Sequence, residues 1–153
     1  MPADVELAYA AGIIDGEGYI QLQRHKRSDY SAGYHYYMAV AVAMVDPVVP
    51  MWLHNTFGGS LHYYERKEPN AQPYYRWSTG TKKAQWFLEL ILPYLKTKKA
   101  QAEIALEFQK LKSENRGKNH KYYLKPVALL EAEAILAEKC SALNSKGQRK
   151  RLT

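Results

Sequence analysis

The chain has 153 residues, of which 46% are hydrophobic and 24% are charged, and its formal net charge is +7. These values fit one globular domain with a core of its own, and they exclude a disordered or collagen-like chain. The one cysteine, Cys140, excludes an internal disulfide and a cysteine-based zinc site. Because the first residues are acidic and their apolar stretch is short, we expect no targeting peptide and no membrane span. The expected location is therefore intracellular, in the cytoplasm, nucleoid or an organelle, and not secreted.

The predicted elements, in chain order, are a helix at 5–14, strands at 19–27 and 34–44, a helix from 46 to about 56, strands at 61–67 and 74–79, and helices at 82–92, 98–111 and 127–143. Asp4, Asp46 before Pro47, and Thr97 are the expected helix caps. The segment 144–147 is expected to end the last helix and to begin a basic tail. The predicted fold class is α+β, in the order αββαββα with additional C-terminal helices.

Basic charge is concentrated towards the C-terminus. Residues 96–153 hold 14 basic and 6 acidic side chains, so the residues before them are nearly balanced. Such an excess attracts polyanions through the release of phosphate counterions, although a solvated basic tail has the same composition. The 13 tyrosines favour nucleic acid, because tyrosine stacks on bases and its hydroxyl reaches phosphates.

Alternation along the two predicted hairpins separates a core face from a polar face. On the first hairpin, Ile20 and Leu22 are expected in the core. The polar face there consists of Gln21, Gln23, His25, Arg27 and, on the second strand, Tyr37. It is interrupted by Ala39, Ala41 and Ala43, which can contact thymine methyl groups or only permit close approach. The second hairpin is ambiguous, since a one-residue bulge would invert its faces. We take Leu61, Tyr63 and Trp77 as core, which leaves His62, Tyr64, Arg66 and Arg76 outward.

The segment Asp15-Gly16-Glu17-Gly18 follows the first predicted helix. Carboxylates at a helix C-terminus face the negative end of the macrodipole, which costs about 0.3–1 kcal/mol each unless a cation is near. Mg²⁺ would suit, because it prefers carboxylate and carbonyl oxygens. The structural alternative is an ordinary surface turn. The preceding helix argues against that alternative, since its small residues Ala8, Ala11 and Gly12 allow two backbones to approach closely.

Residues 10–18, AAGIIDGEG, resemble the motif of the LAGLIDADG homing endonucleases. The first motif residue, usually Leu, is Ala here, and the last acid is Glu. The element order is also similar, so the resemblance covers nearly all of residues 1–153 and implies a single endonuclease domain, with 144–153 as its basic tail. In that family the motif helices pair and the final acid binds the catalytic metals. The resemblance thus implies a homodimer through Ala8, Ala11 and Gly12, with Glu17 as catalytic metal ligand and the Gly16 carbonyl beside it.

The same resemblance implies further roles. Asp46 falls near a metal-bound water, although an N-cap explains it better, and Lys98 falls near the scissile phosphate, although it can also be a solvated helix start. Asp15 would be structural. The family lays its sheet in the major groove, so the polar strand residues named above would bind DNA. A C-terminal segment that touches the central DNA backbone would comprise Asn144, Ser145, Lys146, Arg149 and Lys150.

The sequence therefore predicts an intron-type or intergenic homing endonuclease that cuts both strands of a long, near-palindromic double-stranded DNA site. It would act as a homodimer with Mg²⁺, for which Mn²⁺ or Ca²⁺ can substitute in binding. One alternative is a non-catalytic DNA-binding regulator on the same fold, and another is an RNA-splicing maturase with intron RNA as partner. A small basic RNA-binding protein of ribosomal type is a third, which the acidic helix end does not explain.

Overall fold

The structure is a computed structural model that describes residues 1–115 and 125–149, the last four of them as helix backbone only. Its elements are α1 (Asp4–Glu17), β1 (Gly18–Lys26), β2 (Tyr34–Met44), α2 (Val48–Phe57), β3 (Ser60–Tyr64), β4 (Tyr74–Gly80), α3 (Thr81–Ile91), the 3₁₀ turn η1 (Leu92–Tyr94), α4 (Lys99–Glu114) and α5 (Val127–Arg149). The predicted order αββαββα with additional C-terminal helices is confirmed. No helix among these residues is both long and apolar enough to cross a membrane.

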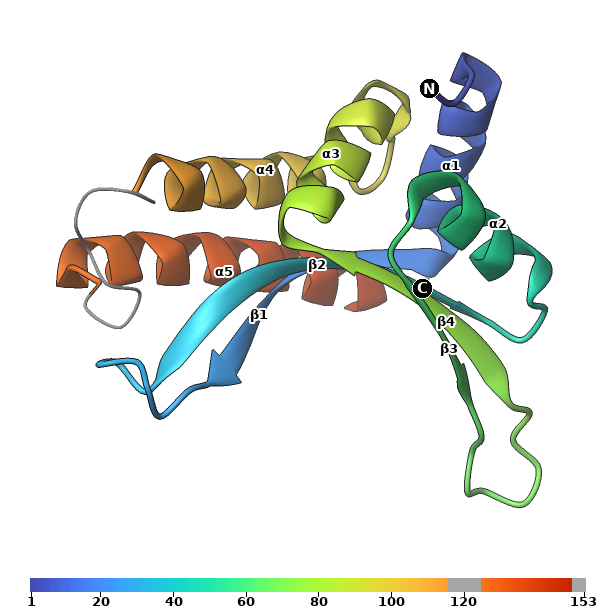
Figure 1. Cartoon of the computed structure of the whole chain (residues 1–153), viewed down its shortest axis with the longest axis horizontal. Helices are drawn as coiled ribbons and strands as arrows, with labels where there is room; N and C mark the ends of the chain where they lie inside the picture. The colour runs from blue at the N-terminus through green and yellow to red at the C-terminus, as the bar shows by residue number, and fades with distance from the viewer. Residues whose placement is uncertain (116–124, 150–153) are drawn as a thin grey trace.

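The four strands form one antiparallel sheet in the order β1-β2-β4-β3. All of the described helices lie on one side of this sheet (Figure 1). The β1–β2 and β3–β4 hairpins extend away from the helices and diverge from each other. The opposite side of the sheet therefore carries no helix from the described part of the chain. We call it the open face.

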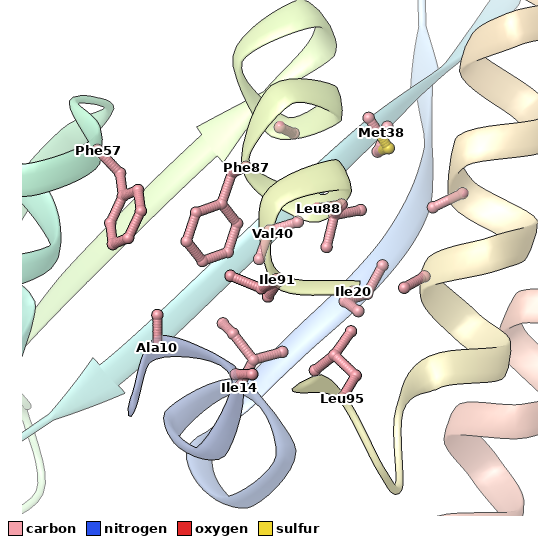
Figure 2. Close-up of a cluster of buried hydrophobic side chains, with 14 of the residues drawn as sticks. Ala10, Ile14, Ile20, Met38, Val40, Phe57, Phe87, Leu88, Ile91 and Leu95 are labelled. Carbon is pink, nitrogen blue, oxygen red and sulfur yellow. The ribbon is translucent and has the colours of Figure 1, made fainter. Parts of the chain in front are cut away.

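The core lies between the sheet and the helices. Phe87, Leu88 and Ile91 of α3 pack over Val40 and Ile20 of the sheet, as Figure 2 shows. All five side chains are fully buried. Burial of a large apolar side chain stabilises a fold by about 1.5–3 kcal/mol, so this cluster fixes α3 on the sheet. Ala10 and Ile14 of α1 complete the cluster at one end.

The predicted orientation of the second hairpin is confirmed, with one correction. Trp77 is fully buried, and its register partner Leu61 packs against the core. Their strand neighbours Arg76 and His62 pair with each other on the open face. Tyr63 shares the core side but is 52% exposed, because the hairpin extends past the helices there. It contacts the ring of Tyr75 at 5.2 Å instead of entering the core.

Several helix ends differ from the predictions. Ala3, not Asp4, is the N-cap of α1, and its N–H donates to the Glu6 carboxylate at 3.0 Å. This helix continues through Glu17, so the acidic segment forms its last turn and is no separate loop. Likewise α5 continues to Arg149 through the segment expected to end it. Its Asn144 amide bonds to another element, so it does not compete for its own helix backbone.

Gly18, where α1 passes directly into β1, has no room for a side chain. A Cβ there would lie 2.8 Å from both Cα and Cδ1 of Ile14, whereas a Cβ at Gly16 would meet nothing within 4 Å. We expect Gly18→Ala to lower the free energy of unfolding by about 1–3 kcal/mol, as overpacking does. The matched Gly16→Ala change should raise it by about 0.5–1 kcal/mol, because alanine favours helix. Urea unfolding measures both, and equal effects would contradict the close approach.

Candidate active site and DNA-binding face

Asp15 connects the last turn of α1 to the start of α4. Its carboxylate accepts the backbone N–H groups of Lys96, Thr97 and Lys98 at 2.9, 3.1 and 3.0 Å. It also accepts the Thr97 hydroxyl at 3.0 Å. These N–H groups lie in the turn that leads into α4, at its N-cap Lys98 and the two residues before it, so a carboxylate from α1 fixes the path of the chain into α4. Asp15 thus has a structural position, and Thr97 donates to it instead of capping α4.

Lys98 occupies the C-terminal end of α1. Its Nζ donates to the carbonyl oxygen of Ile14 at 2.8 Å and also to that of Gly18. Partial burial lowers the pKa of Lys98, while the negative charges of Asp15 and Glu17 act in the opposite direction. The ammonium neutralises the negative end of the helix dipole. One cation at this helix end is therefore the ammonium of Lys98, and the Mg²⁺ that the sequence predicts there stays a prediction.

Glu17 is the last residue of α1 and is exposed. Among the described residues its carboxylate has no hydrogen-bond or ion-pair partner, unlike that of Asp15. Gly16, beside it, is exposed as well. A free carboxylate and a backbone carbonyl are hard oxygen donors that suit Mg²⁺. Residues 1–115 and 125–149 contain no group of three or more acidic, histidine or cysteine side chains that could hold a metal.

Asp46 caps α2. Its Oδ1 accepts the backbone N–H of Val48 at 2.9 Å, and the side chain is exposed. This bond explains an aspartate before Pro47 without any catalytic role. The catalytic role of Asp46 stays a prediction.

The β1–β2 half of the open face carries the predicted polar residues. Gln21 and Gln23 are half-buried and His25 is exposed. The Tyr37 hydroxyl donates to Oε1 of Gln23, and the Tyr37 ring lies 4.4 Å from that of His25. Burial raises the pKa of Tyr37, so the hydroxyl stays protonated and remains a donor at neutral pH. These interactions fix the Gln23 amide in place, as direct reading of a base edge requires.

Tyr19 is a member of the open face that the sequence predictions omitted. Its hydroxyl accepts a hydrogen bond from Nη2 of Arg76, whose guanidinium lies 5.7 Å from the Tyr19 ring centroid. This interaction crosses β2 at Ala41, which pairs with Tyr19 and is fully buried. Ala41 and the nearly buried Ala39 therefore cannot meet thymine methyl groups, and they serve close approach instead. The alternation that placed Gln21 on this face also applies to Tyr19, two residues earlier.

Two other arginines predicted on the hairpins, Arg27 and Arg66, lie beyond the strand ends. Arg27 follows β1 and forms an ion pair with Asp29, whose carboxylate it contacts at 2.6 Å. This hydrogen-bonded pairing lowers the pKa of Asp29 to about 2. Arg66 follows β3, and its guanidinium lies 4.8 Å from the Tyr74 ring centroid. The prediction placed both arginines within strands of the sheet, and the structure places both outside it. His62 and Tyr64, by contrast, are exposed on β3.

The C-terminal candidates are separated by the structure. Asn144 is partly buried, and its Nδ2 donates to the carbonyl oxygen of Ile20 at 3.0 Å, while its DNA contact stays a prediction. Ser145 is exposed on α5. The side chains of Lys146 and Arg149, and all of Lys150, lie outside the described residues.

The predicted dimer residues also differ in position. Ala8 and Gly12 are exposed on α1, and a Cβ at Gly12 would meet nothing within 4 Å. Ala11, about 60° around the helix from Ala8, is fully buried in the core of its own chain, so it cannot offer surface to a partner. The exposed side of α1 instead includes Val5, 75% exposed, and Tyr9, 50% exposed.

Comparisons with known proteins define the fold. No protein-family model matches the chain. No curated protein matches it either. Among solved structures, the homing endonuclease I-CvuI in complex with its target in the presence of Ca is 24% identical, with a TM-score of 0.72 over 91% of this chain and 82% of that one. The archaeal intron-encoded homing endonuclease I-Vdi141I, complexed with DNA, is 16% identical, with a TM-score of 0.73 over 92% and 84%.

A third similar structure is the LAGLIDADG homing endonuclease I-SmaMI bound to cleaved DNA, which is 20% identical with a TM-score of 0.63. The match covers 85% of this chain but 42% of I-SmaMI, so this chain corresponds to less than half of that protein. At these identities the likeness establishes architecture. The chain has the fold of the LAGLIDADG homing endonucleases.

Proposed function

We propose that this chain is a homing-type DNA endonuclease, which binds double-stranded DNA on its open face and hydrolyses phosphodiester bonds beside Glu17. The fold likeness to DNA-bound endonucleases supports the class of activity. The observation that supports this site is the Glu17 carboxylate, which has no partner among the described residues. It lies at the C-terminal end of α1, where the Lys98 ammonium already neutralises the negative end of the helix dipole. A carboxylate that is exposed and has no structural bond among the described residues remains available to bind a cation.

The donor set at the helix end fits a divalent cation. Glu17 oxygens would hold it, with the Gly16 carbonyl beside them, and similar structures contain Ca or Mg. When bound, Mg²⁺ supplies Lewis-acid stabilisation of phosphate oxygens and a lower pKa for water. The chain's own contribution is fixed positive charge, because the Lys98 ammonium is held by two carbonyl oxygens before any substrate arrives. Charge that is positioned in advance stabilises a developing phosphate charge at no cost of reorganisation.

A homodimer would supply a second α1 helix to pack against the first and a second Glu17. Gly12 and Gly16 lie inside α1, where glycine costs about 0.5–1 kcal/mol relative to alanine. Neither has a positive φ, and no described neighbour would be met by a Cβ at either position. Close approach of a second α1 explains both glycines. A two-fold interface of this kind would bring a second Glu17 beside the first and would produce two equivalent cuts.

Plasmid cleavage tests the proposal. A plasmid library with randomised sites is incubated with the protein in Mg²⁺, in Ca²⁺ and in EDTA, and linear products are sequenced. We expect double-strand cuts at one long, near-palindromic site in Mg²⁺ and none in EDTA. Binding to the same library without cuts in Mg²⁺ would identify a non-catalytic regulator. Failure to bind DNA, with specific binding of structured RNA, would favour a maturase.

The open face and the basic C-terminus should give two classes of binding variant. Gln23→Ala or Arg66→Ala should relax preference at particular base pairs, because in this proposal the Gln23 side chain on β1 and the Arg66 side chain just beyond β3 contact base edges. Lys146→Ala or Lys150→Ala should weaken binding to all sequences and reduce the slope of log affinity against log salt by about one for each phosphate that the variant no longer binds. Library binding at two salt concentrations measures both. The reverse assignment of effects would make the C-terminal segment the specificity element.

A further inference from the structure

The outer edge of β1 is filled by side-chain donors. β1 is the first strand of the sheet order and has a strand neighbour only on its β2 side. Gly18 and Ile20, two residues apart, direct their carbonyls to the same edge. The Gly18 carbonyl accepts Nζ of Lys98, and that of Ile20 accepts Nδ2 of Asn144 at 3.0 Å. Cys140, one turn before Asn144, also donates to the Ile20 carbonyl at 3.5 Å. Open strand edges need such cover, and here α5 and the start of α4 provide it.

The same groups belong to a network of hydrogen bonds around the acidic C-terminal end of α1. Asp15 of α1 accepts the N–H of Lys98 at the start of α4. Gln101, one turn further along α4 and 7% exposed, directs its Nε2 to Oδ1 of Asn144 at 3.5 Å. Asn144 on α5 then binds Ile20, which follows Glu17 by three residues along the chain. Four elements thus hold one another at the point where Glu17 and Lys98 lie.

An asparagine is suited to this junction. Its amide is both a donor and an acceptor, and both functions have partners here, on β1 and on α4. Aspartate at this position would offer no donor to the Ile20 carbonyl at neutral pH, and alanine would offer neither function. The Cys140 thiol, whose pKa is raised by burial, is protonated but is a weak donor and does not replace the amide.

Building on the nuclease function proposed above, we propose that Asn144 is a positioning residue. It acts through the Ile20 carbonyl and Gln101 to hold Lys98 in place relative to Glu17, and it does not contact DNA. The sequence placed Asn144 in a segment that touches the DNA backbone, whereas its side chain is engaged in internal bonds. Its role is therefore in the rate of cleavage and not in affinity.

Asn144→Ala and Asn144→Asp test this, with the exposed Ser141→Ala on the same helix as control. The substrate is the site recovered from the plasmid library. We expect the single-turnover cleavage rate in Mg²⁺ to fall about 10- to 100-fold, as small misplacements of catalytic groups cause. Affinity in Ca²⁺ and the salt slope of binding should stay at the parental values. A weaker affinity with a salt slope reduced by about one would show a phosphate contact and overturn the proposal.

A second measurement does not depend on cleavage. NMR titration of the Lys98 ammonium in the metal-free, DNA-free protein should show its pKa rising towards the ordinary value in Asn144→Ala, as Lys98 gains water, and unchanged in Ser141→Ala. Gln101→Ala, which keeps the bond to Ile20, should shift it in the same direction by less and covers the case that Asn144→Ala does not fold. An unchanged Lys98 in both variants overturns the positioning role. If the parent protein cuts no DNA, the proposed nuclease function is refuted. The change in the pKa of Lys98 still tests the positioning role of Asn144 in that case.

Discussion

We expect Glu17→Gln to bind DNA as the parent does and to lose its cleavage. The change removes the negative charge of the proposed metal ligand but keeps its volume. Because Glu17 is exposed and has no partner among the described residues, the free energy of unfolding should stay at the parental value. Loss of one group that stabilises a transition state costs about 10²–10³-fold in rate, and loss of a metal ligand should cost at least that. Single-turnover cleavage in Mg²⁺, with DNA binding in Ca²⁺, gives the two numbers.

The matched control is Glu103→Gln, an exposed glutamate on α4. It removes the same charge away from the helix end and should leave cleavage at the parental rate. If Glu17→Gln still cuts DNA at a rate near that of the parent, the metal site lies elsewhere and Glu17 is an ordinary helix-end acid.

The second large effect should come from Gly12→Leu, which we expect to separate the dimer and abolish double-strand cleavage. Within one chain the new side chain points into open space, so the monomer fold should persist. Between two closely packed α1 helices it would overpack, which costs about 1–3 kcal/mol and raises the dimer Kd by about 10- to 100-fold. Sedimentation velocity over a range of concentrations measures this shift.

Glu107→Leu places an equal side chain on an exposed position of α4 and serves as the control for added surface hydrophobicity. It should leave the dimer intact. A parent that is monomeric at micromolar concentration, or a Gly12→Leu variant with the parental dimer Kd, would contradict the assignment of α1 as the interface.

Local patterns were enough to predict the strands and the faces of the first hairpin, and they left the faces of the second hairpin ambiguous. Alternation put Trp77 in the core and Arg76 outside, since a strand's neighbours and burial follow a period of two. Helix ends were predicted less well, because they depend on partners elsewhere in the fold. The expected end of α5 is the example: Asn144 is a common helix breaker by composition, but a carbonyl on β1 engages its amide and the helix continues.

The site was predictable in part for the same reason. The motif indicated Glu17, and the resemblance indicated Lys98. No local signal could show that Asp15 accepts N–H groups more than 80 residues away, or that Lys98 reaches back to the end of α1. Ala11 shows a second limit of prediction from sequence. Its small size indicates close packing, but periodicity alone could not show whether that packing is within the chain, as the structure has it, or between two chains.

The bond between Tyr19 and Arg76 couples the two hairpins of the open face. An arginine already held by a tyrosine on another strand has little conformational freedom left to lose, so if Arg76 binds a base as proposed, we expect it to contribute more affinity than a free side chain would. The same bond makes sequence preference non-additive. A substitution at Arg76 also releases Tyr19, so changes of specificity selected separately in each hairpin will not combine as a sum of their parts.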